Sequence, residues 1–421
     1  MRHVAGLTII FAWLAGPALA DVVLPGSNHG TDGVFAPTAS IQIDLGKAQS
    51  GPGITWESPG GDMDGDGIGD GVYDRTKWAV VFKFSSVNIP SGVTVTFKNH
   101  PSCAPVVWLV SESVTINGSV SVNGNNGLGV TAPEPGPGGF RGAFPWTSAA
   151  AVGSGGFGPG GGIRYPGAGS YGTLGQGSSG GLYGNAAIVP LLGGSGGSIS
   201  MHDFMGTRWH TGGAGGGAIL IAAVGACSLN GSVTANGGNT NSPGIGPGGA
   251  GGAIRLIADS IVGTGTLRAR GARPTYETYI GGEGRIRVEY LSQMALTDLG
   301  IPLASVATLA GPPVIWPEDA TPAVKIISVG PATVSNDPLA DMIEEPDVRI
   351  TPDQAQNLTI TIAAQFVPLD WTVSVRLVPR SGADSVVNAI FQSGDATASV
   401  WTAQLSLNDG FSALQAAAVA P

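Results

Sequence analysis

One acidic loop contains five residues that could bind a metal ion through oxygen atoms. Residues 62–70 read DMDGDGIGD, with carboxylates at the first, third, fifth and ninth positions of the loop. Glycine at the sixth position allows a sharp turn, and a backbone carbonyl at the seventh completes the oxygen set that Ca²⁺ prefers. The predicted ligands are Asp62, Asp64, Asp66, Ile68 through its carbonyl, and Asp70. An acidic, solvated turn without a metal is the alternative.

Arginines of the central region could contact a ligand. The predicted ligand-binding residues are Trp108, Arg255, Arg268, Arg270 and Arg287. Alignment of similar segments places Trp108, Arg255 and Arg287 in one outward column, and Arg268 alternates outward with Arg270 on a nearby strand. Guanidinium groups can hold the carboxylates of an acidic polysaccharide bidentately. The alternative is a solvated strand face whose arginines are balanced by nearby acidic residues.

Other residues of the chain only weakly match patterns of catalytic or metal sites. Residues 193–197 read GGSGG, which matches a nucleophile elbow but lacks its strand–turn–helix context. His202, Asp203 and His210 have no further histidine or cysteine at ligand spacing. The paired carboxylates of glycoside hydrolases are not evident in the central region. The sequence therefore predicts no catalytic residue and leaves an enzymatic function open.

The elements that must position these residues follow a repeated pattern. Residues 107–124, 219–237 and 254–271 are similar when aligned on Gly118, Gly231 and Gly265, and weaker copies lie near Gly92 and at 284–288. Within the three copies, small polar residues alternate with apolar residues that should face inward: Val120, Val122, Val233, Ala235, Leu267 and Ala269. Short strands between glycine corners bury a continuous core only when they stack, which predicts a β-solenoid of at least five coils.

The two cysteines allow at most one intramolecular disulfide. Cys227 aligns with Val114 and Ile261, both apolar. We therefore expect a buried, unpaired thiol rather than a bridge to Cys103.

Composition and the N-terminus indicate where the protein acts. Arg2, the apolar stretch 7–14 and small residues up to Ala20 predict a secretory signal of bacterial type, cleaved after Ala20. No later apolar run approaches the roughly 20 residues of a transmembrane helix. The formal charge is −10 and lies mostly beyond Trp316, so the chain lacks the basic surface of a nucleic-acid-binding protein. We expect a secreted or cell-surface protein without a nucleic-acid partner.

Changes in composition divide the chain into segments. The signal peptide (1–20) is followed by an N-terminal cap with the acidic loop (21–78), a solenoid (79–310), a proline-rich linker (311–322) and a β-sandwich (323–421). A glycine-rich insertion interrupts the solenoid at 127–217. Its glycines keep no strict third-position register, which excludes collagen, and its aromatic residues favour ordered loops over a flexible tract.

Together, these features resemble exported, glycine-rich bacterial proteins with a right-handed parallel β-helix of the pectate-lyase-like type and a C-terminal immunoglobulin-like module. The resemblance implies an all-β fold and no assigned activity. The acidic loop resembles those of thrombospondin type 3 and dockerin repeats. We expect a non-enzymatic surface or matrix protein that binds glycans or other envelope components, with Ca²⁺ in a structural role. A polysaccharide lyase or glycoside hydrolase, and a purely structural or self-assembling protein, are the alternatives.

Overall fold

The computed structural model is all-β, with one short 3₁₀ helix, η1 (Leu45–Lys47), among the described residues. The described residues are 22–127, 133–144, 154–164, 166–201, 209–240, 246–274, 278–339, 345–380 and 383–421. The expected signal peptide lies outside them. Within these ranges, no helix is long and apolar enough to cross a membrane.

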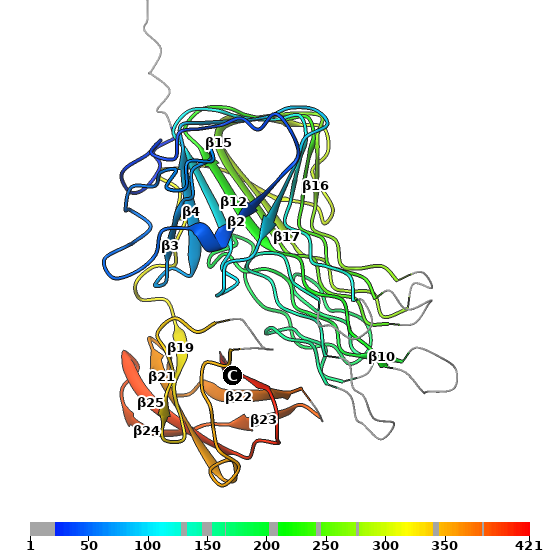
Figure 1. Cartoon of the computed structure of the whole chain (residues 1–421), viewed down its shortest axis with the longest axis vertical. Helices are drawn as coiled ribbons and strands as arrows, with labels where there is room; N and C mark the ends of the chain where they lie inside the picture. The colour runs from blue at the N-terminus through cyan, green and yellow to red at the C-terminus, as the bar shows by residue number, and fades with distance from the viewer. Residues whose placement is uncertain are drawn as a thin grey trace, which may run out of the picture.

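Parallel strand ladders form the body of the molecule (Figure 1). An eleven-stranded sheet holds two of them. The first ladder joins β4 (Ala79–Phe84), β7 (Val106–Val110), β12 (Ala218–Ala223), β15 (Ala253–Gly263), β17 (Arg285–Leu296) and β18 (Ser305–Thr308). The second joins β1 (Val34–Phe35), β5 (Ser86–Ile89), β8 (Val114–Ile116), β13 (Cys227–Leu229) and the later halves of β15 and β17. The antiparallel strand β3 (Val72–Asp74) closes the edge beside β4.

The third ladder is a separate five-stranded parallel sheet. Its strands are β2 (Ile41–Asp44), β6 (Thr94–Lys98), β9 (Ser119–Ser121), β14 (Ser232–Thr234) and β16 (Thr266–Arg268). The six side chains expected to face inward from the three clear copies are all at most 1 % exposed, which confirms their burial. They pack in one apolar core with side chains of the eleven-stranded sheet.

The corner between β5 and β6 is longer than the alignment of Gly92 with Gly118 assumed. Ile89 pairs with Ile116, and Thr94 pairs with Ser119. Four residues separate the first members of these pairs, whereas two separate the second members. The two extra residues shift the strand register after this corner, so Gly92 does not occupy the position of Gly118.

Beyond these strands, extended glycine-rich segments continue the chain, and they hydrogen-bond to one another at every third residue. The N–H groups of Gly194 and Gly197 donate to the carbonyls of Gly216 and Gly213 at 2.8 and 2.9 Å. In turn, Gly213 and Gly216 donate to Pro247 and Ala250 at 3.1 and 2.9 Å. A three-residue period is that of the polyproline II helix, which leaves its backbone groups available to several neighbours. Elsewhere in this region, the short strands β10 (Ser200–Met201) and β11 (Trp209–His210) form an antiparallel pair.

Two antiparallel sheets around their own apolar core form the C-terminal part, which lies to one side of the body (Figure 1). One contains β19 (Ala323–Val329), β20 (Ala332–Thr333), β21 (Leu358–Gln365), β24 (Ile390–Gly394) and β25 (Ala398–Leu405). The other contains β22 (Thr372–Pro379), β23 (Ser385–Asn388) and β26 (Ser412–Val419). The chain passes from one sheet to the other at Ala389, between β23 and β24.

A buried ion pair attaches these C-terminal sheets to the glycine-rich segments. Arg376 on β22 contacts Asp384, and its guanidinium donates to the carbonyls of Gly156, Gly158 and Gly162 at 3.2 Å. Asp384 accepts a hydrogen bond from the N–H of Gly155 at 3.0 Å. A side chain at position 155 would collide with that carboxylate, which explains the glycine.

The proline-rich segment between body and C-terminal sheets is anchored over its first half. Ile315 is buried, and the Trp316 ring lies 5.5 Å from that of Trp56 in an edge-on arrangement. Residues 318–323 are exposed. Gly311, Pro312 and Val314 are exposed as well, so the segment is held mainly through Ile315 and Trp316.

Candidate functional site

The acidic loop brings three of its five predicted ligands together. Carboxylate oxygens of Asp62, Asp64 and Asp70 lie within 4.8 Å of one another. Backbone N–H groups fold the loop around Asp62, which accepts hydrogen bonds from Gly65, Asp66 and Gly67 at 2.8, 3.1 and 2.8 Å. The loop therefore turns around Asp62 and brings three of the four predicted carboxylates together.

Lys47 partly neutralises the loop. Its ammonium contacts Asp64 and lies 3.2 Å from Asp66. Asp66, the fourth predicted carboxylate, is not part of the cluster. The hydrogen bond from Lys47 holds the pKa of Asp64 below its usual value. The fifth predicted ligand, Ile68, packs its side chain against the main core.

Asp32, which the sequence reasoning missed, fixes both ends of the loop. Its Oδ1 accepts hydrogen bonds from Gly61 at 2.9 Å and from Gly71 at 3.1 Å. Burial raises the pKa of Asp32, and the hydrogen bonds from backbone N–H groups oppose that rise. Asp32 lies about thirty residues before the loop, so no local spacing marks it.

The arginine column is covered, not exposed. Arg255 is 2 % exposed, and its Nε and Nη2 each lie 2.7 Å from Oε2 of Glu289. Its Nη1 donates to the carbonyl of Val314 at 2.9 Å. Arg287 donates to Ser305 at 2.8 Å and lies 3.3 Å from Oε1 of Glu289. The two guanidinium groups therefore share one internal carboxylate.

Trp108 does not belong to this column, and its outward placement was wrong. The strand register pairs Trp108 with Ile221, whereas Leu220 pairs with Arg255. The indole is fully buried, with the rings of Phe35 and Phe84 at 5.6 and 5.7 Å. A one-residue error in register moves a side chain to the opposite face of a strand.

The other two predicted arginines lie at the end of β16 and two residues beyond it. Arg268 forms an ion pair with Asp298 at 2.7 Å, and this contact lowers the pKa of that carboxyl. Arg270 is half-buried, and its Nε has no hydrogen-bond partner within the described part of the chain. Of the predicted ligand-binding residues, only these two stand on a polar sheet face.

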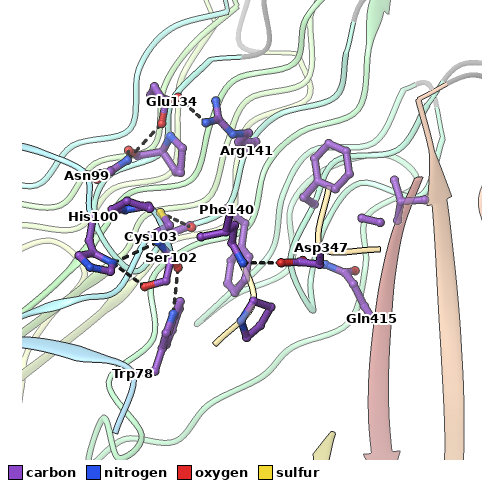
Figure 2. Close-up of a pocket in the computed structure, with 18 of the residues that line it drawn as sticks. Trp78, Asn99, His100, Ser102, Cys103, Glu134, Phe140, Arg141, Asp347 and Gln415 are labelled. Carbon is purple, nitrogen blue, oxygen red and sulfur yellow. Dashed lines mark hydrogen bonds and ion pairs between the residues drawn. The ribbon is translucent and has the colours of Figure 1, made fainter. Parts of the chain in front are cut away.

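A cleft of about 1350 Å³ opens between the body and the C-terminal sheets (Figure 2). One wall carries hydrogen-bonding groups and aromatic rings from the body. Asn99 donates to Glu134 at 3.2 Å, and Glu134 forms an ion pair with Arg141. Nδ1 of His100 lies 2.8 Å from the hydroxyl of Ser102, whose carbonyl accepts a hydrogen bond from the Trp78 indole at 2.9 Å.

The cleft also contains buried polar atoms without partners. Among the described residues, these are Oδ1 of Asn99, the hydroxyl of Ser412 and Oε1 of Gln415. Asn99 belongs to the body, whereas Ser412 and Gln415 belong to β26 on the opposite wall. Buried polar atoms in folded proteins nearly always have a hydrogen-bond partner, either protein or water. A ligand that offers donors and acceptors to both walls would supply them.

Neither the cysteines nor the GGSGG segment supplies a nucleophile. Both cysteines are free and buried, and burial raises the pKa of Cys103 and of Cys227 to about 12. Cys227 pairs with Val114 and Ile261, which confirms their alignment. Ser195 is fully buried; it accepts from Gly160 at 3.0 Å and donates to Tyr183 at 2.9 Å.

The third weak candidate cannot be placed, because His202 and Asp203 lie outside the described residues, as does the side chain of His210. Comparisons of this chain with protein-family models, curated proteins and solved structures found no match.

Proposed function

We propose that this protein is an exported, non-enzymatic β-solenoid that binds a glycan of a cell surface or matrix in the cleft. In this proposal the three parallel ladders are the faces of a right-handed parallel β-helix, and the C-terminal sheets are an immunoglobulin-like module. The observation that carries the proposed function is the cleft itself, where aromatic rings and hydrogen-bonding side chains of the body face β26.

The chemistry of the cleft favours a hydroxyl-rich ligand. Sugar hydroxyls both donate and accept, so they can satisfy the carbonyl oxygens of Asn99 and Gln415 and the hydroxyl of Ser412. Trp78 and Phe140, which line the cleft, offer ring surface to the apolar faces of sugars (Figure 2). The carboxylate of Glu134 is already engaged by Arg141 and Asn99, which favours binding over proton transfer to a leaving group.

We expect Asn99→Ala and Gln415→Ala each to weaken glycan retention about fivefold, since each removes one hydrogen bond to the ligand. Retention of the purified chain on a panel of neutral and acidic polysaccharides measures this, and Gln392→Ala, an exposed glutamine on β24, is the matched control. The same mixtures are assayed for new ends of the polysaccharide chains, which cleavage would produce. Cleavage would favour the lyase or hydrolase alternative, and failure to bind any polymer would leave the structural alternative.

We also propose that the acidic loop binds Ca²⁺. Three clustered carboxylates and a turn fixed from both ends by Asp32 support this proposal. The ion would take the place of the Lys47 ammonium beside Asp64 and support the N-terminal cap.

Ca²⁺ should raise the melting temperature, because binding to the folded state alone stabilises it by about 2.7 kcal/mol at a hundredfold excess over Kd. Asp62→Asn should abolish the shift. Lys47→Met should strengthen binding, because it removes the competing cation. Asp409→Asn, on an exposed turn, serves as the control. Calorimetry of the metal-stripped chain that shows no heat of binding at millimolar Ca²⁺ would contradict the proposal.

A further inference from the structure

The outer face of the five-stranded parallel sheet carries polar side chains in rows that cross the strands. The strand register places neighbouring members side by side, except that β6 and β9 pair only at Thr94–Ser119 and Val95–Val120; beyond those two pairs the rows follow from the alternation along each strand. In the third row, the Oδ1 atoms of Asn123 and Asn236 accept hydrogen bonds from the N–H groups of Asn236 and Arg270. The first row is Thr94, Ser119, Ser232 and Thr266. The second row is Gln42, Thr96, Ser121, Thr234 and Arg268. The third row is Asp44, Lys98, Asn123, Asn236 and Arg270.

The rows face outward because the residues between them face the core. Val95, Val120, Val233 and Leu267 are fully buried, and side chains of a strand alternate between its two faces. The row residues are partly or fully exposed. Adjacent members also contact one another, as the hydroxyls of Ser119 and Ser232 do at 2.9 Å. The result is a polar surface that repeats at the strand spacing of about 4.8 Å.

This polar surface is continuous with the cleft. Gln42, Thr96, Ser121 and Asn123 belong to its second and third rows and also line the cleft. Thr234, Asn236, Arg268 and Arg270 extend the same rows beyond the cleft. A polysaccharide bound in the cleft could therefore continue along the rows and stay in contact with hydrogen-bonding side chains.

The charges of the rows largely cancel. Lys98 lies 2.7 Å from Asp44, and Arg268 lies 2.7 Å from Asp298. Most of the remaining members carry hydroxyl or amide groups. The surface is therefore better suited to an uncharged polymer than to a uronate chain.

We propose that an extended, neutral polysaccharide runs from the cleft across the strands along these rows, so that successive sugars contact successive strands. The inference rests on the proposed glycan-binding function and specifies its ligand class and path. It assigns a ligand to the regular outer face, whose polar residues also serve the solvation of an exposed sheet face. It also gives the half-buried Arg270 a position at the far end of the path.

The test compares neutral β-glucan oligosaccharides of increasing length with polygalacturonate. Affinity for the β-glucan series should rise with chain length and should be insensitive to salt, which screens only charge interactions. The double variant Ser232→Ala/Thr234→Val should weaken binding of the long oligosaccharides about tenfold and leave the shortest unaffected. Its matched control is Thr115→Val/Ser228→Ala, a hydroxyl pair on the outer face of another ladder.

The outcomes separate this inference from the proposed function. Binding that does not depend on length and is unchanged in the double variant would overturn the path along the rows but leave the cleft as a binding site. Tighter, salt-sensitive binding of polygalacturonate would overturn the neutral ligand class. If no polysaccharide bound, both the inference and the proposed function would fall.

Discussion

Gly215→Ala is expected to destabilise the protein by about 3 kcal/mol or more, because backbone atoms leave no room for a methyl group. A Cβ at this position would lie under 3.0 Å from the carbonyl oxygen of Gly194 on the neighbouring segment. That carbonyl belongs to the backbone of a packed segment and cannot rotate away as a flexible side chain could. The segments would have to separate, and the hydrogen bonds between them would be lost.

Gly181→Ala is the matched control within the same glycine-rich insertion. A Cβ there meets nothing within 4 Å, and residue 181 is exposed. This substitution should be neutral or stabilising by about 0.5 kcal/mol, because alanine restricts the unfolded chain. Denaturant unfolding of both variants measures the difference. Equal stability of the two variants would contradict the close packing of the segments.

The inward-facing residues could be predicted because small polar and apolar residues alternate in the short strands. Val120 and Val233 stand between serines and threonines, so their face follows from the sequence alone. Trp108 stands in the run VVWLV, whose five residues are all buried. The core covers one face of β7, and a second apolar cluster that includes Val107 and Leu109 covers the other. Because this run does not alternate, only its alignment with the other copies could indicate which side chains face the core. That alignment was shifted by one residue.

The same second cluster explains why the arginine column is internal. Ile315 of the proline-rich segment and Tyr171 of the insertion belong to this cluster. Both come from parts of the chain far from β15 and β17, so nothing near Arg255 in the sequence indicates that they cover it. An outward position in a strand ladder is exposed only where no other segment packs on it.

The acidic loop could be found from the sequence because its ligands lie within nine residues. The cleft could not, since its walls combine residues between 42 and 157 with residues between 324 and 416. The sequence also did not indicate the three-residue period of the hydrogen bonds in the insertion. Glycine is required where a Cβ would collide with a neighbouring backbone, as at Gly194, Gly197 and Gly215, and those neighbours come from distant parts of the sequence.

Arg255→Ala is expected to cost about 3 kcal/mol, the lower end of the range for removing one partner of a buried ion pair. Glu289, which is also buried, would lose its two shortest contacts and keep only Arg287 at 3.3 Å. The carbonyl of Val314 would lose its donor from Arg255, which would loosen the attachment of the proline-rich segment. Thermal or denaturant unfolding measures this loss.

The control for this substitution is Arg273→Ala, whose side chain is 51 % exposed in its pair with Glu283 and which should cost at most about 1 kcal/mol. Glycan retention per folded molecule should be unchanged in both variants, because Arg255 has no surface toward solvent from which to contact a polymer. An Arg255→Ala variant with normal stability and weakened retention would contradict the internal role of this residue. It would also restore the arginine column as a ligand-binding site and move the glycan from the polar rows to the opposite side of the core.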